Sequence, residues 1–194
     1  MFNAKIFLYR IKRQIDKLKG KTRDDFDWRL YNILYRGEVV DIAKEHTPIL
    51  KESDYIFKDD RLTKNREGLK PLHPNHRLLY ETILQLNPGS VLELGCGGGD
   101  HLHNISLLIK NAKLYGLDVS SEQLTFLKER HPDLNAVIKQ HNCTLPFPPE
   151  FPQVDIAYTH AVIMHIQAGN GHMVALSNLI PRGHQTGGAY GKLE

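Results

Sequence analysis

The sequence is poor in cysteine: Cys96 and Cys143 are the two thiols among its 194 residues. Two cysteines so far apart do not make the disulfide framework of a small secreted domain, so we expect both to be reduced and the chain to be cytoplasmic. The chain has 11 histidines, but neither a cysteine nor a clear carboxylate partner stands at ligand spacing from them. We therefore expect no metal site.

Long apolar runs are missing as well. No stretch approaches the roughly 20 apolar residues that a membrane-spanning helix needs. The apolar run at residues 6–9 is too short for a signal peptide and is followed at once by Arg10, Lys12 and Arg13. The net charge of +3 is weak evidence for an acidic partner, and no aromatic and basic groove typical of nucleic-acid-binding proteins is evident. One globular core with an appendage is the arrangement that remains.

The chain divides into three zones: residues 1–70, a basic and helical extension; residues 71–180, a domain; and residues 181–194, an irregular tail. In the first zone, residues 27–44 favour a second helix and residues 45–70 a mobile connection or lid. Apolar residues recur at helical spacing near the N-terminus, flanked by lysine and arginine. We expect this stripe to pack on the domain; the alternative is peripheral contact with an anionic membrane surface. The stripe consists of Phe7, Leu8, Ile11, Ile15 and Leu18.

Strand and helix signals alternate in the second zone. Helices are expected at residues 74–86 and 100–110 and after a cap at Ser120 or Ser121, and strands at residues 90–94, 113–117, 135–139 and 154–158. This alternation predicts an α/β fold, an open parallel sheet with helices on both faces. Such sheets bind ligands beyond the carboxyl ends of their strands.

A glycine turn with an unusual neighbour follows the first of these strands. Gly95, Gly97 and Gly99 remove side chains where backbone approaches a ligand, and the next helix begins there. Asp100 occupies the place where the NAD fingerprint wants glycine or alanine. Glu93, two residues before the turn, would repel a pyrophosphate but suits a cationic ligand. The pattern therefore favours S-adenosylmethionine over a dinucleotide.

A second carboxylate, Asp118, ends the neighbouring strand and should face the same crevice. A carboxylate at this place accepts hydrogen bonds from both hydroxyls of a ribose. Together, these features indicate a nucleoside ligand that carries positive charge. They are the glycine turn, Glu93 and Asp118.

Four stretches resemble class I S-adenosylmethionine-dependent methyltransferases: VLELGCGGG at residues 91–99, YGLDVS at 115–120, NCTLPF at 142–147 and VDIAYTH at 154–160. The resemblance implies a Rossmann-like fold and S-adenosylmethionine as the cofactor. Asn142 departs from the family, which usually has aspartate in this adenine-covering loop. The cofactor-binding residues that it implies are Glu93, Gly95, Cys96, Gly97, Gly99, Asp118, Val119, Asn142, Cys143 and Thr159.

The resemblance places the methyl acceptor near the end of the fourth strand, where Tyr158 and His160 are the candidate catalytic residues. His160 suits a general base because its intrinsic pKa lies near neutrality; the alternative is a packed histidine that shapes the pocket. We expect a small-molecule or lipid-linked acceptor. Two alternatives are a non-catalytic module that binds S-adenosylmethionine and a nucleic-acid methyltransferase that uses the basic N-terminal zone.

The tail does not continue the fold that the resemblance implies. A fifth buried strand is expected after residue 179, but Pro181 and four glycines occupy residues 181–194. A single-base frameshift near Leu179 is one explanation and a genuine flexible tail is the other. In either case we expect the fourth strand to be a sheet edge, the later strands of the family fold to be missing, and the chain to be catalytically impaired.

Overall fold

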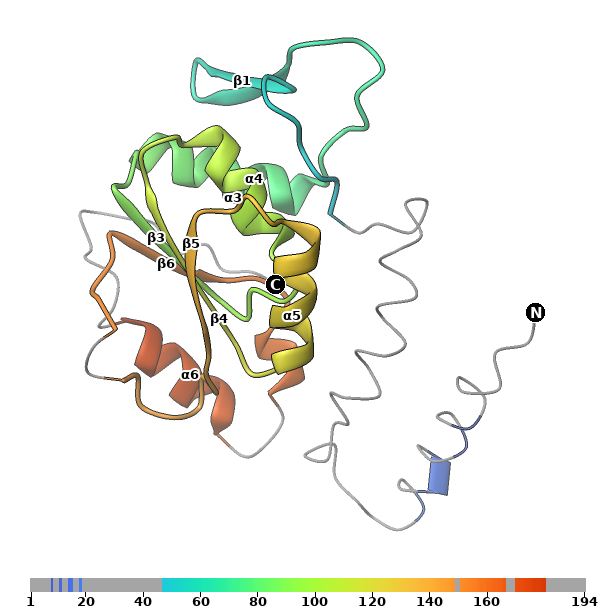
Figure 1. The fold of residues 1–194 in the computed structure, drawn as a ribbon, viewed down its shortest axis with the longest axis vertical. Coiled ribbons are helices and arrows are strands. Elements are labelled where there is room, and N and C mark those ends of the chain that lie inside the picture. The colour runs from blue at the N-terminus through green and yellow to red at the C-terminus, as the bar shows by residue number, and fades with distance from the viewer. Residues whose placement is uncertain are drawn as a thin grey trace.

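A computed structural model of the chain describes residues 47–148, 151–166 and 170–180, with isolated positions at 8, 11, 14, 15 and 18. Its centre is a parallel four-stranded sheet of β3 (Ser90–Leu94), β4 (Lys113–Asp118), β5 (Ala136–Gln140) and β6 (Ile156–Thr159), in the order β5-β4-β3-β6 (Figure 1). The predicted open parallel sheet is confirmed. Among the described residues β6 is an edge strand, as expected.

Helices cover both faces of this sheet. α3 (Pro74–Leu86), α4 (Asp100–Leu108) and α5 (Ser121–Arg130) pack on the face that carries Val91 and Leu114. α6 (Gly171–Leu179) packs on the opposite face, against Leu92 and Leu94, together with the loop before β6 (Figure 1). Because side chains alternate along a strand, β3 contributes to both hydrophobic cores.

The helices begin where their sequences favour capping. Pro74 occupies the first turn of α3, where its missing N–H costs no hydrogen bond, and Asn87 ends the helix in the left-handed conformation at φ 44°. Ser120 caps α5 through its side chain, which accepts a hydrogen bond from the Gln123 N–H at 3.2 Å. A short 3₁₀ helix, Ile163–His165, follows β6.

The segment predicted as a mobile connection contains an antiparallel hairpin instead, β1 (Tyr55–Lys58) and β2 (Arg61–Lys64). Leu62 lies in the hydrophobic core at 2% exposure, and its backbone N–H donates to Glu81 Oε1 of α3 at 2.8 Å. Leu50, which precedes the hairpin, is buried in the same core. The prediction of a mobile lid over residues 45–70 was therefore wrong where the structure describes it, and the folded body extends N-terminally of residue 71.

The expected second helix at residues 27–44 and the irregular tail at residues 181–194 lie outside the described residues. In the first zone, Leu8, Ile11, Ile15 and Leu18 are helical and between 40% and 87% exposed. These four side chains do not pack on the domain, contrary to the expectation. In the described part of the chain, no helix is both long and apolar enough to cross a bilayer.

Candidate functional site

The glycine turn between β3 and α4 is fastened to the neighbouring strand. The backbone N–H groups of Gly95 and Cys96 both donate to the carbonyl of Leu117 in β4, at 2.6 and 3.0 Å. Gly95 has a φ of 75°, and a Cβ there would lie 2.1 Å from Val162 Cγ2. Both the backbone conformation and the contact require glycine at this position.

Gly97 has room for a small side chain. Its φ is 49°, and a Cβ built on it makes only an ordinary contact with Gln123 Oε1 at 3.7 Å. A larger side chain would extend from the glycine turn at the carboxyl ends of β3 and β4, where the ligand is expected. Gly99 forms the N-cap of α4, and its N–H donates to the Cys96 carbonyl at 2.8 Å.

Asp118, at the end of β4, ties the glycine turn to α5. Its Oδ2 accepts a hydrogen bond from the Gly97 N–H at 2.9 Å, and its Oδ1 accepts one from the Ser120 N–H at 2.8 Å. Burial raises the pKa of this carboxyl, and the N–H donors partly offset the rise. Each carboxylate oxygen keeps a further acceptor site, so Asp118 can hold the turn and still accept from a ligand.

Glu93 lies in the middle of β3 and is 2% exposed. Burial raises its pKa to about 8; the Tyr158 hydroxyl lowers it, and Asp118 and Asp100 raise it. Its Oε2 is buried and accepts no hydrogen bond of ordinary geometry from any residue that the structure describes. A buried carboxylate oxygen without a donor is costly unless a cation or a proton balances it. Glu93 therefore fits a positively charged ligand group.

Tyr158, a candidate catalytic residue, points into the hydrophobic core from β6. It pairs with Glu93 across the strands, and its buried hydroxyl also lacks a hydrogen bond of ordinary geometry among the described residues. Burial and the neighbouring Glu93 carboxyl raise the pKa of the hydroxyl far above its usual range. A phenol in this setting influences Glu93 and remains protonated.

The two thiols lie in different environments. Cys96 is 6% exposed and belongs to the core, and burial raises its pKa well above the usual value. Its side chain lies next to Gly116 of β4, where a Cβ would come within 2.9 Å of Sγ. Cys143 is half-buried against the other core. Cys96 therefore contributes its backbone N–H to the glycine turn, while its thiol is buried. Of the two thiols, only that of Cys143, in the loop after β5, is partly accessible.

The residues expected around the adenine and at the end of β6 are placed at the same edge of the sheet. Val119 is 39% exposed beside Asp118, and Asn142 is exposed at the start of the loop that follows β5. Asn142 Oδ1 accepts hydrogen bonds from the backbone N–H and the hydroxyl of Thr144, at 3.0 and 2.9 Å. The Thr159 hydroxyl donates to the Leu94 carbonyl at 3.1 Å.

His160 lies immediately after β6, among residues that the sequence did not connect with it. Its ring makes edge-on contacts with His76 of α3 and His101 of α4, with centroids 5.1 and 4.7 Å apart. Burial, and to a smaller extent His73, lower the pKa of His160, so the ring is neutral at physiological pH. Sequence spacing could not reveal this cluster, because its members come from three segments far apart in the chain.

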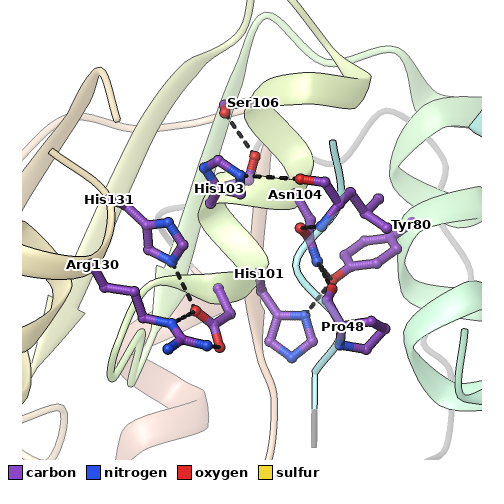
Figure 2. Close-up of polar contacts among 10 residues, drawn as sticks. Pro48, Tyr80, His101, His103, Asn104, Ser106, Arg130 and His131 are labelled. Atoms are coloured by element: carbon purple, nitrogen blue, oxygen red, sulfur yellow. Dashed lines mark hydrogen bonds and ion pairs between the residues drawn. The ribbon is translucent and has the colours of Figure 1, made fainter. Parts of the chain in front are cut away.

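A buried polar network on the same face of α4 supports the cluster. Asn104 is fully buried and donates through Nδ2 to the Tyr80 hydroxyl and the Pro48 carbonyl, both at 2.9 Å. The Tyr80 hydroxyl in turn lies 2.7 Å from His101 Nδ1. Figure 2 shows the contacts that link Asn104, Pro48, Tyr80 and His101. The network joins α3, α4 and the segment before the hairpin.

Asp100, at the start of α4, forms a half-buried ion pair with the end of α5. Arg130 Nε and His131 Nε2 lie 2.8 and 2.7 Å from its Oδ1 (Figure 2). Despite burial, these partners lower the pKa of Asp100. Asp100, which occupies the position where the NAD fingerprint has glycine or alanine, thus links α4 to the end of α5 on one face of the sheet.

Fold and site together define an α/β domain in which a buried carboxylate, Glu93, and a half-buried one, Asp118, flank a glycine turn at the carboxyl ends of β3 and β4. A family model described as "Methyltransferase domain" matches residues 91–180. This segment is a methyltransferase domain of the class I, S-adenosylmethionine-dependent kind, as its motifs predicted.

Several solved structures of methyltransferases match part of this chain. The methyltransferase domain of bacterial CtHen1-CN is 24% identical, with a TM-score of 0.48, and the match covers 54% of this chain and 57% of that one. The plantazolicin methyltransferase BpumL, solved with SAH, is 20% identical at a TM-score of 0.44, covering 57% and 46%. CalS10, an amino pentose methyltransferase from Micromonospora echinaspora, is 14% identical at a TM-score of 0.48, covering 59% and 48%.

The chain thus spans about half the length of these solved structures. A search of curated proteins found no match to the sequence.

Proposed function

We propose that this domain serves methyl transfer from S-adenosylmethionine to a small-molecule or lipid-linked acceptor, and that this chain retains the activity in impaired form. The observation that carries the proposal is the buried Glu93 carboxyl beside the glycine turn, whose Oε2 accepts no hydrogen bond of ordinary geometry from the residues that the structure describes. When bound, S-adenosylmethionine supplies an electrophilic methyl group on a positively charged sulfonium, and it also carries a cationic amino group. Either positive charge would stabilise the Glu93 carboxylate.

The remaining cofactor contacts follow from the crevice. Asp118 offers its free acceptor sites to the ribose diol, while its two backbone donors hold it in place. Gly97 leaves room for the ligand to approach the backbone. Val119 presents an exposed apolar side chain, and Asn142 an amide, for the adenine. The thiol of Cys143 lies in the same loop.

The acceptor side is assigned to the end of β6. His160 is neutral and half-buried there, so it can take a proton from an acceptor hydroxyl or amine. Tyr158 acts indirectly: its buried hydroxyl lies beside Glu93 and adjusts the proton affinity of that carboxyl. Thr159 keeps β6 in register with β3 through its bond to the Leu94 carbonyl.

A turnover assay tests the proposal. The full chain is incubated with S-adenosylmethionine labelled on its methyl group and, in parallel, with small-metabolite, lipid and RNA fractions. We expect weak label in the small-metabolite or lipid fraction, because the chain is expected to be catalytically impaired, and none with Gly97→Val, whose larger side chain would occupy the space expected for the ligand. Label in RNA alone would identify a nucleic-acid methyltransferase, and cofactor binding with no transfer to any fraction would identify a binding module; either result rejects the proposal.

A further inference from the structure

Three histidines from three elements converge beside the carboxyl end of β6. His76 of α3 and His101 of α4 are 6% and 9% exposed, and His160 is half-buried. One ring nitrogen from each residue lies within 4.8 Å of one from each of the others. The rings meet edge to face rather than stacked, with interplanar angles of 84°, 74° and 65°.

The spacing is close to that of a metal site. Three atoms no more than 4.8 Å apart all lie within roughly 2.8 Å of one common point. Zinc–nitrogen bonds measure about 2.0–2.1 Å, so an inward movement of less than about 1 Å would complete the coordination. His160 follows the strand in a bend and is only half-buried, and it is therefore the ring with room to make that movement.

The second observation is a partner that orients one of the rings. Tyr80 Oη lies 2.7 Å from His101 Nδ1, and Asn104 Nδ2, itself fully buried, donates to the same oxygen at 2.9 Å. In the tautomer whose Nδ1–H donates to Tyr80, the Nε2 lone pair of His101 becomes the ligand. Metal-binding histidines are commonly fixed in this way through their second nitrogen.

We propose that His76, His101 and His160 bind one divalent transition-metal ion of the zinc class, with a further coordination position left for an oxygen ligand. Imidazole nitrogens suit such ions, and three protein ligands with one open position are typical of zinc sites that take part in chemistry. In the metal-bound form His160 is a ligand, and the proton-accepting role passes to the oxygen held at the open position. This inference does not depend on methyl transfer, and its test uses no turnover.

The experiment measures metal binding to the full chain. Metal-free protein is titrated with Zn²⁺ in competition with a chromogenic chelator, and with Co²⁺ while the visible spectrum is recorded. We expect one equivalent of each ion, with Co²⁺ bands of a four- or five-coordinate nitrogen and oxygen site and no thiolate charge-transfer band. His160→Gln should weaken Zn²⁺ binding on the order of 100-fold, and Tyr80→Phe by about 10–100-fold.

His103→Gln is the matched control, since His103 lies on the same helix but stacks on His131, at 4.4 Å between centroids, outside the cluster. It should bind metal like the unmodified chain. If His160→Gln proves unstable by circular dichroism, His76→Gln replaces it. A folded chain that binds no stoichiometric metal, a Co²⁺ spectrum with thiolate bands, or equal affinities for His160→Gln and His103→Gln would each overturn the proposal.

Discussion

Glu93 combines a fully buried position with a pKa of about 8, so without a ligand it carries a proton at neutral pH. The folded state holds this proton up to about pH 8, whereas the unfolded chain releases it near 4.5. Its contribution to stability is therefore fully present below about pH 4.5 and is lost as the pH rises through 8.

Replacing Glu93 by Gln should remove this pH dependence. The loss of thermal stability between pH 6 and pH 9 should be smaller in Glu93→Gln than in the unmodified chain, because the amide cannot ionise. Cofactor affinity should fall in the variant at both pH values, since the negative charge is gone. Identical melting profiles against pH would show that Glu93 does not titrate in this range.

Asp118→Ala should weaken S-adenosylmethionine binding by about 1.5–3 kcal/mol, the scale of hydrogen bonds to a charged group. It should also lower the free energy of unfolding by about 1–3 kcal/mol, because the N–H groups of Gly97 and Ser120 lose their acceptor. Calorimetry and thermal melts measure the two effects. Asp155→Ala is the control, an exposed carboxylate bonded to Ser90 at the other end of the sheet; if it weakens binding equally, the ribose assignment fails.

The thiols offer a test of the placement of the loop after β5. Cys96 should resist alkylation with or without cofactor, because it is buried and its pKa is raised. Cys143 should react, and bound S-adenosylmethionine should slow that reaction. Mass spectrometry after timed labelling distinguishes the two sites. Protection of Cys96 alone, or a Cys143 rate indifferent to cofactor, would contradict the placement.

At the scale of elements, the Asn104 side chain on α4 links that helix to α3 and to the segment before the hairpin. Besides its bonds to Tyr80 and Pro48, its Oδ1 accepts from the Leu50 N–H at 2.9 Å. Asn104→Ala removes the partner of the Leu50 N–H and of the Pro48 carbonyl and leaves the Tyr80 hydroxyl with His101 alone, so the free energy of unfolding should fall by about 2–4 kcal/mol in chemical denaturation. Ser106→Ala, on the same helix, removes only a bond to the His103 carbonyl and should change stability far less. Equal effects of the two would mean that Asn104 does not anchor this segment.

The elements that could be predicted from sequence are those with local signals. Helix 74–86 and strand 90–94 were predicted with the bounds they have, because proline, asparagine and glycine mark their ends. The third and fourth strands were placed one and two residues early, since burial and pairing, not local residue type, set their starts. The hairpin was missed because its strands are four residues each and mostly polar; the buried Leu62 is its one apolar clue.

The residues of the candidate site also fall into two groups, those that local sequence signals predict and those that only the tertiary structure brings together. Glu93, Asp118 and the glycines were found because they are close together in sequence or at the ends of adjacent strands. Asn104 and the cluster of His76, His101 and His160 depend on how α3 and α4 lie against β6, which only the tertiary structure reveals. Cys96 was expected among the cofactor-binding residues, but its side chain is buried in the core beside Gly116, which only the tertiary structure reveals.

At the scale of the whole molecule, the crevice lies where β3 and β4 end, between a glycine turn and two carboxylates, and the histidine cluster borders it at the end of β6. One face of the sheet, with α3 and α4, supplies both Glu93 and the histidines. The residues proposed to bind the cofactor and the residue proposed to face the acceptor thus lie on one support of parallel strands, which suits the alignment that methyl transfer needs.

Calorimetry of the full chain with S-adenosylmethionine tests this account most directly, with folding of every sample verified by circular dichroism. The account predicts one equivalent of bound cofactor, release of protons from Glu93 at pH 7 that disappears above about pH 8, and no binding by folded Gly97→Val. A folded chain that binds no S-adenosylmethionine, or a Gly97→Val variant that binds it like the unmodified chain, would contradict the central claim.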